Sequence, residues 1–158
     1  MTLPAACTLR PATVEDATTI QAQRDAMFTE MGSPPERVAQ AHAGSLAWFR
    51  AALEIGTYTG ILIEEAGRVV GGAGVVWLSL PPSPRTLPAV RAYMDNVYVQ
   101  PSARGRGLAG QMVRHLLAQC AQRGVQLVSL HATEVGRPIY TRLGFETTNE
   151  MRLMLETS

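Results

Sequence analysis

The fold is decided by the stretch YMDNVYVQPSARGRGLAG, which occupies positions 93–110. Aromatic and β-branched side chains alternate around Val97 and Val99, and this pattern predicts a strand over residues 93–99. Pro101 has no N–H to donate to a neighbouring strand, so the strand should end close to it. The stretch therefore predicts a strand, a short loop, a glycine-rich turn and then a helix.

The glycine-rich turn has the composition of an anion-binding site. Gly105 and Gly107 remove side chains where the backbone enters a helix beginning at Leu108. The first N–H groups of a helix have no partner within it and lie at the positive end of its dipole. None of the four residues before the helix is a Ser, Thr, Asp or Asn that could cap those groups. Arg104 and Arg106 add positive charge, so we predict that the turn binds a phosphate group.

The helix after the turn should bury one face. Gly124 follows Arg123 as a C-terminal stop. Cys120 lies on the apolar stripe, so we expect a buried thiol there rather than a disulfide with the distant Cys7. The residues of that stripe recur at helical spacing and are Leu108, Met112, Val113, Leu116, Leu117 and Cys120.

Two phosphate-binding families fit the same residues. Residues 105–110 spell G-x-G-x-x-G, the dinucleotide fingerprint. That fold brings its strand almost directly into the first glycine and continues with a long α/β region, whereas here residues 100–104 intervene and little chain remains. Residues 104–109 also spell R-x-x-G-x-A. With the preceding Val-x-Val-x-Pro run, this resembles the signature of the GCN5-related N-acetyltransferases (GNAT), in which the turn holds the pyrophosphate of acetyl-CoA.

The resemblance implies an acetyl-CoA site along the central strand and the turn. In the family the pantetheine arm pairs with this strand like an added strand, which assigns cofactor contacts to the main chains of Val97 and Val99. A backbone N–H there would also stabilise the oxyanion of the tetrahedral intermediate. The family often has Asn where Thr133 stands and Ala where Gly136 stands, so Thr133 is expected to offer the arm a hydroxyl contact instead. The pyrophosphate contacts fall on Arg104, Gly105, Arg106, Gly107, Leu108 and Ala109.

A second motif lies at residues 139–145, IYTRLGF, which resembles the family's late motif [LI]-Y-x-x-x-G-F. In the family its tyrosine, here Tyr140, lies close to the thioester sulfur. A phenol, whose pKa is near 10, is protonated at neutral pH and can donate a proton to the departing thiolate. We therefore expect Tyr140 to be the general acid; the alternative is that it only ties the last helix to the sheet.

The general base has two candidates. Asp95 lies two residues before Val97, so strict alternation predicts that its carboxylate shares a strand face with Val97 and Val99. It could take the proton of the incoming ammonium, directly or through water, or it could bind a substrate cation or join an internal hydrogen-bond network. His131 on the next predicted strand is the second candidate.

The remaining elements follow the order of the N-acetyltransferase fold, a mixed α/β (α+β) arrangement with a mostly antiparallel twisted sheet and about four helices. Phe28, Met31 and Trp48 lie where the family builds its acceptor pocket. The proline-rich loop over 81–88 either walls the substrate site or is a passive connector. The expected helices cover 13–30, 34–53, 108–123 and 133–143; the other strands cover 8–10, 57–65, 68–80 and 125–131, with a terminal β segment over 145–155.

Length and composition fit a single domain over residues 1–158. There is no apolar run of membrane-spanning length, and the first ten residues lack a basic region followed by an apolar core, so we expect a cytoplasmic protein. A net charge of +1 gives no field that would recruit nucleic acid. The three histidines and two cysteines show no metal-ligand spacing.

These observations predict an acetyl-CoA-dependent N-acetyltransferase that acts by direct attack in a ternary complex on an amine of a small molecule or peptide, without a metal. Homodimers are frequent in the family. Three alternatives stay open. The first is a non-catalytic acyl-CoA-binding module, the second is a dinucleotide-dependent enzyme, and the third is an O- or longer-chain acyltransferase.

Overall fold

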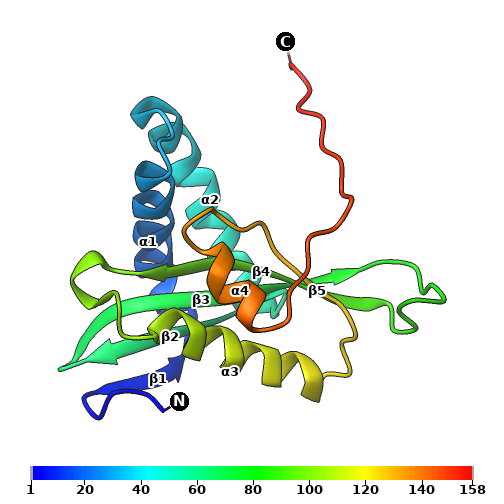
Figure 1. Ribbon diagram of the computed structural model, residues 1–158. Helices are drawn as coiled ribbons and strands as arrows, with labels where there is room; N and C mark the ends of the chain where they lie inside the picture. Colours follow the sequence, from blue (N-terminus) through cyan, green and yellow to red (C-terminus); the bar gives the residue numbers. More distant parts are fainter. Residues whose placement is uncertain (1, 158) are drawn as a thin grey trace.

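The computed structural model describes residues 2–157, which form a five-stranded sheet flanked by helices (Figure 1). Neighbouring strands are antiparallel except β4 and β5, which are parallel. The strands lie in the order β1 (Cys7–Pro11), β2 (Tyr58–Glu65), β3 (Arg68–Ser79), β4 (Val90–Val99) and β5 (Val128–Ser129). The helices are α1 (Ala17–Glu30), α2 (Pro35–Ile55), α3 (Leu108–Gln122) and α4 (Arg137–Arg142), with short 3₁₀ turns η1 (Val14–Asp16) and η2 (Pro101–Ala103).

The predicted mixed fold with a mostly antiparallel sheet and four helices is confirmed. The dinucleotide-binding alternative requires a mostly parallel sheet with strands continuing after the glycine turn. Within residues 2–157, only the two-residue strand β5 follows that turn, and its pairing with β4 is the only parallel one. The topology therefore excludes the dinucleotide-binding fold.

Helix α3 covers one face of the sheet, and helices α1 and α2 pack against the other. The side chains of β2 alternate between the two faces, as those of a strand must. Ile61 and Ile63 join the core under α3, whereas Tyr58 and Leu62 join a second core with Phe49 of α2. The predicted stripe of α3 is confirmed, since its buried residues are Leu108, Met112, Val113, Leu116 and Cys120, with Leu117 half-buried.

Three predicted elements are shorter than expected. The strand predicted over 125–131 is reduced to Val128–Ser129, because only Ala92 and Tyr93 of β4 pair with it. The helix predicted over 133–143 begins only at Arg137, after a turn in which the Thr133 hydroxyl accepts a hydrogen bond from Gly136 N–H at 3.0 Å. The first predicted helix opens with the 3₁₀ turn η1 before α1 begins.

The terminal β segment predicted over 145–155 is wrong. Residues 145–157 form no strand, and residues 146–157 are exposed throughout. Figure 1 shows this segment leaving the body of the molecule beyond α4. A strand needs a partner of matching length to satisfy its N–H and C=O groups, and β5 is two residues long.

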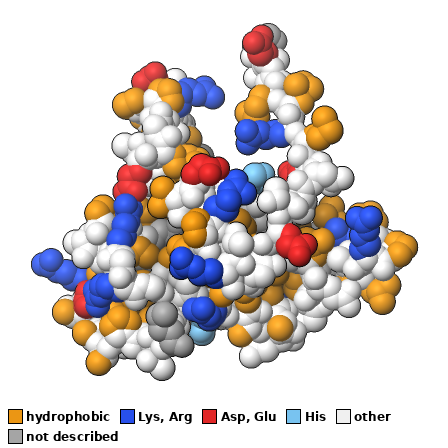
Figure 2. Space-filling model, viewed as in Figure 1, with side chains coloured by type: hydrophobic (Ala, Val, Ile, Leu, Met, Phe, Trp, Pro, Cys, Tyr) orange, Lys and Arg blue, Asp and Glu red, His pale blue; other side chains and the backbone are white. Residues whose placement is uncertain are grey.

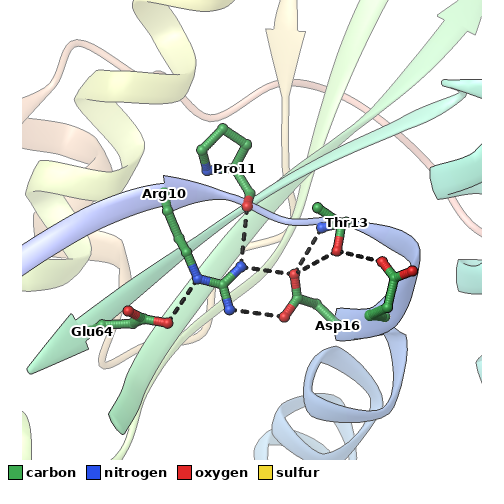
Figure 3. Close-up of polar contacts among 6 residues, drawn as sticks. Arg10, Pro11, Thr13, Asp16 and Glu64 are labelled. Carbon is green, nitrogen blue, oxygen red and sulfur yellow. Dashed lines mark hydrogen bonds and ion pairs between the residues drawn. The ribbon is translucent and has the colours of Figure 1, made fainter. Parts of the chain in front are cut away.

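A cluster of charged residues ties β1 to β2 and to the start of the first helical region (Figure 3). The Arg10 guanidinium donates to Asp16 at 2.8 and 2.9 Å and to Glu64 at 2.7 Å. Asp16 also accepts a hydrogen bond from the Thr13 backbone N–H at 2.8 Å. The hydrogen bonds from Arg10, helped by that from Thr13, hold the pKa of the Asp16 carboxyl below its ordinary value.

Acid should therefore weaken the fold through Asp16. Its pKa is lower in the folded chain than in the unfolded chain, so its contribution is present above the unfolded pKa and is lost as the pH falls through the folded pKa. The free energy of unfolding should decrease between pH 6 and pH 2. We expect this decrease to be roughly 0.5–1 kcal/mol smaller in Asp16→Asn than in the wild type. Urea unfolding across this range measures the difference, and Glu146→Gln serves as an exposed control. Parallel acid dependence of Asp16→Asn and wild type would contradict the prediction.

Candidate active site

A β-bulge in β4 sets the direction of the residues around the centre of the sheet. Gly72 pairs with Tyr98 and Gly74 pairs with Asp95, so one residue of β3 lies opposite two residues of β4. Asn96 lies within this bulge at a φ of +56°, in the left-handed region that residues with side chains rarely adopt. The extra residue interrupts the two-residue alternation of β4 at this point.

The bulge corrects the predicted position of Asp95. Strict alternation placed its side chain on the same face as Val97 and Val99, and this prediction is wrong. The two valines pack with the core under α3. Asp95 instead lies on the opposite face, beside α1, where its carboxylate accepts a hydrogen bond from Arg24 at 3.0 Å.

Arg24 of α1 holds the polar centre of this face in place. One of its guanidinium nitrogens donates both to Asp95 Oδ2 and, at 2.7 Å, to Asn96 Oδ1. The guanidinium lies 4.9 Å from the centre of the Phe28 ring. Asp95 also accepts a hydrogen bond from the Asn96 backbone N–H at 2.9 Å. The carboxylate is thus fixed in orientation, and about a quarter of its side chain stays accessible to solvent.

A pocket of about 220 Å³ opens between α1, α2 and the sheet at this point. Three residues were predicted for an acceptor pocket, and one of them, Trp48, lines this pocket. Phe28 is not in the lining, but its ring packs against the Arg24 guanidinium. Met31 is exposed at the end of α1, outside the lining. Asp95, predicted as a base, also lines the pocket. Sequence reasoning missed the remaining lining residues, because nothing in a helical repeat marks a residue such as Arg24 as facing a strand. The lining consists of Arg24, Ser45, Trp48, Phe49, Val76, Tyr93 and Asp95.

His131 lies next to one wall of this pocket. Its Nδ1 is 2.6 Å from the Tyr93 hydroxyl, and its Nε2 is 3.8 Å from Glu150. Burial, followed by the charge of Asp95, raises the pKa of Tyr93 above its ordinary value. The Tyr93 phenol therefore keeps its proton at neutral pH and can donate a hydrogen bond to Nδ1 of His131, whereas Nε2 lies on the side of Glu150.

The edge of β4 that faces β5 is open over most of its length. Pairing stops after Tyr93, and no strand of residues 2–157 pairs on that side of β4 from Met94 to Val99. An open edge of this kind presents backbone N–H and C=O groups to whatever extended group lies beside it. Val97 and Val99 are on this part of the strand.

The glycine turn lies just beyond the end of β4. Gly105 and Gly107 have φ values of +78° and +75°, which favour glycine at both positions. Gly107 is the N-cap of α3 and carries no side chain that could accept from the first N–H groups of this 15-residue helix. The side chain of Leu108 is buried and that of Ala109 half-buried, so these residues present backbone rather than side chain to the turn.

The two arginines of the turn are paired with carboxylates. Arg104 donates to the Val99 carbonyl at 2.7 Å and forms an ion pair with Glu30 at 2.7 Å. Arg106 forms a two-pronged ion pair with Glu65 at 2.6 and 3.0 Å. The predicted extra positive charge of the turn is therefore largely neutralised, and its backbone N–H groups are the anion donors that stay available.

Tyr140 lies on α4, half-buried against the core under α3. Its ring packs edge-on against Phe145 at a centroid distance of 5.7 Å. Its hydroxyl forms no hydrogen bond within residues 2–157. Burial, followed by the charge of Asp95, raises the pKa of Tyr140, so the phenol stays protonated at neutral pH. Gly136 makes room for the ring, because a Cβ there would lie 3.3 Å from it.

The described residues include no group of three or more His, Cys, Asp or Glu side chains placed to hold a metal ion. Among the helices seen in residues 2–157, none combines the length and apolarity needed to cross a membrane.

The sequence and the structure are similar to known proteins. A family model described as an acetyltransferase (GNAT) domain matches residues 8–148. The chain is 34% identical, over 95 residues, to the glucosamine 6-phosphate N-acetyltransferase of Trypanosoma brucei brucei. That alignment covers 58% of this chain and 61% of the relative, so the match spans less than two thirds of the curated protein.

Two solved structures are similar over nearly the whole chain. A GCN5-related N-acetyltransferase from Ralstonia eutropha is 34% identical, with a TM-score of 0.91 and coverage of 94% of this chain and 98% of that one. A protein described as a predicted acetyltransferase from Clostridium acetobutylicum, solved with acetyl-CoA, is 23% identical, with a TM-score of 0.88 and coverage of 94% of this chain and 96% of that one. The second likeness shows the shared fold alone.

Proposed function

This chain belongs to the acetyltransferase (GNAT) family, and from that premise we propose that it transfers the acetyl group of acetyl-CoA to a primary amine of a small molecule or peptide. One observation carries the proposal. The open edge of β4 leads from Asp95 and the pocket at one end to the glycine turn at the other. An extended cofactor with a phosphate group at one end and a reactive acyl group at the other matches this arrangement.

The turn and the strand would hold the cofactor. The N–H groups at the start of α3 would bind the pyrophosphate, because they are uncapped and lie at the positive end of the helix dipole. The main chains of Val97 and Val99 would pair with the pantetheine arm along the open edge. The Thr133 hydroxyl accepts from Gly136 N–H and keeps its own proton for a contact with the arm. Arg104 and Arg106 would mainly hold the turn in place through Glu30 and Glu65.

The chemistry would proceed by direct attack. The amine nitrogen bonds to the thioester carbonyl carbon, and the resulting oxyanion is stabilised by a backbone N–H of β4. Collapse of this intermediate breaks the carbon–sulfur bond, and Tyr140 donates its proton to the thiolate. The extra proton on the attacking nitrogen passes through water to the Tyr140 phenolate, which restores the acid. Asp95 receives the proton of the incoming ammonium, directly or through water; His131 is the alternative base. The products are the acetylated amine and coenzyme A.

Titration calorimetry with acetyl-CoA, with NAD as a control, tests the cofactor half of the proposal. Binding of acetyl-CoA alone is expected. A panel of amines should then be tested by detecting the free thiol of released coenzyme A. Failure to bind acetyl-CoA would refute the function, and binding without turnover on any amine would favour the non-catalytic alternative.

Replacement of Asp95 by Asn should lower kcat/KM for the acceptor amine by about 100-fold. The variant keeps the shape of the side chain but loses the charge that attracts the ammonium and accepts its proton. Affinity for acetyl-CoA should stay within about twofold, because the β4 main chain is unchanged. Steady-state kinetics and calorimetry measure both values. If His131→Ala loses activity while Asp95→Asn does not, His131 is the base and Asp95 is not.

A further inference from the structure

The Arg24 guanidinium has one edge without a partner in the pocket between α1, α2 and the sheet. Its Nη1 donates to Asp95 Oδ2 at 3.0 Å and to Asn96 Oδ1 at 2.7 Å, whereas its Nε and Nη2 form no hydrogen bond within residues 2–157. Both of these nitrogens stay accessible, and about a quarter of the side chain is exposed. The rings of Phe28 and Phe49, at 4.9 and 5.8 Å, help to hold the guanidinium in place.

The free edge of Arg24 has the geometry that binds a carboxylate. Nε–H and one N–H of Nη2 point in the same direction from a planar group, and this fork matches the two oxygens of a carboxylate. Arg24 is one of the residues that line the pocket. A small anion that enters the pocket can therefore receive two parallel hydrogen bonds.

The Asp95 carboxylate next to this edge can bind a cation. Its Oδ1 accepts from the Asn96 backbone N–H at 2.9 Å and its Oδ2 accepts from Arg24 at 3.0 Å. An ionised carboxylate can accept about four hydrogen bonds, so Asp95 keeps the capacity to accept from an ammonium group. The pocket thus holds an acceptor for a positive group and a donor edge for a negative group side by side.

The other large side chains of the pocket wall are aromatic or apolar. They include Trp48, Phe49 and Val76, and Trp48 is 45% exposed although it packs edge-on against Phe49. The pocket volume of about 220 Å³ lies below the roughly 300–1,000 Å³ of pockets that hold drug-sized molecules. These properties suit a molecule of amino-acid size with an apolar side chain.

The charges around the pocket favour a ligand with no net charge. Arg24 and Asp95 balance each other, and a polycation would bring a like charge against Arg24. On the face drawn in Figure 2, acidic and basic side chains are interspersed, and the whole chain has a net charge of only +1, so no broad field attracts polycations. A free α-amino acid carries an ammonium and a carboxylate on the same carbon, as close together as the two charges of the pocket.

We propose that the acceptor is a free α-amino acid with an apolar side chain. Nε and Nη2 of Arg24 bind its carboxylate, Asp95 binds its amine, and its side chain packs against Trp48 and Phe49. This inference rests on the proposed acetyl transfer and narrows the class of amine. It separates a free amino acid from a peptide N-terminus, in which an uncharged amide replaces the carboxylate.

L-Leucine and L-leucinamide form a matched pair of acceptors that tests the role of Arg24, because they differ only in the carboxylate. In the wild type, kcat/KM for leucine should exceed that for leucinamide by at least about 30-fold. The amine of leucinamide is the less basic of the two, so amine reactivity at neutral pH would favour leucinamide and cannot produce this preference.

Arg24→Gln should reduce the preference for leucine to within about threefold. Because Arg24 also orients Asp95, the rates with both acceptors should fall, and the ratio of the two kcat/KM values is the readout. Arg50→Gln is the control, since it removes the same charge from an exposed position of α2 outside the pocket lining and should keep the wild-type ratio. Equal kcat/KM values in the wild type, or a preference retained in Arg24→Gln, would overturn the proposal.

Binding of leucine can be measured without turnover. Calorimetry with and without coenzyme A should show binding of L-leucine to the wild type, and binding at least about tenfold weaker both for L-leucinamide and in Arg24→Gln. Circular dichroism checks that each variant is folded. If leucine does not bind, the inference fails even where other amines are acetylated. If leucine binds as expected but is not acetylated, the amino-acid site stands and the proposed acetyl transfer to it fails.

Discussion

Replacement of Gly107 by Asp is expected to lower affinity for acetyl-CoA by about 100-fold or more. Gly107 is the N-cap of α3 at a φ of +75°, immediately before the N–H groups proposed to hold the pyrophosphate. Asp would add a carboxylate that accepts from those N–H groups and repels the phosphates. Hydrogen bonds to a charged group contribute about 1.5–3 kcal/mol each. Loss of two of them, about 3–6 kcal/mol, corresponds to at least a 100-fold change in Kd.

The control for this variant lies at the other end of the same helix. Gly124 has a φ of +74°, and a Cβ there would meet nothing within 4 Å. Gly124→Asp therefore carries a similar backbone strain and the same new charge, but far from the N-terminal N–H groups of α3. Calorimetry should give it an affinity within about threefold of the wild type. Equal losses in the two variants would indicate general destabilisation, and retained affinity in Gly107→Asp would refute the phosphate site.

Replacement of Tyr140 by Phe should lower kcat by about 100-fold while leaving affinity for acetyl-CoA within about twofold. The ring would still pack against Phe145 and the α3 core, so the fold should be retained. Only the hydroxyl proton proposed for the thiolate is lost. Burial and the charge of Asp95 raise the pKa of Tyr140, so the acid keeps its proton through the neutral range. Deprotonation of Tyr140 should therefore cause no loss of wild-type activity as the pH rises toward 10.

Tyr98→Phe is the matched control, because it removes the same atom from a half-buried phenol of β4 outside the lining of the acceptor pocket. Its kcat should stay within about threefold of the wild type. Rapid-reaction and steady-state assays with thiol detection measure both variants. Unchanged turnover in Tyr140→Phe would remove Tyr140 as the acid. Equal losses in both variants would point to a structural effect of hydroxyl removal.

Apart from the terminal β segment, the amino-acid sequence determined which elements form and their order. Glycine and proline positions marked the ends of α2, β4 and α3, because these residues act through their own backbone conformation. The buried stripe of α3 could also be predicted, because its residues recur at helical spacing and all face the same core. The two family-like motifs, at residues 104–109 and 139–145, are likewise local, and they were visible without knowledge of any contact.

Only the tertiary structure decided how the site is assembled. The bulge at Asn96 moved Asp95 to the face of β4 opposite the two valines, and it depends on pairing with β3, which no pattern within β4 reports. Arg24 reached Asp95 across 71 positions of sequence. The arginines of the turn proved to be paired with distant glutamates. The C-terminal segment was predicted to be a strand but has no partner strand within residues 2–157, and a strand depends on a neighbour that local sequence cannot supply.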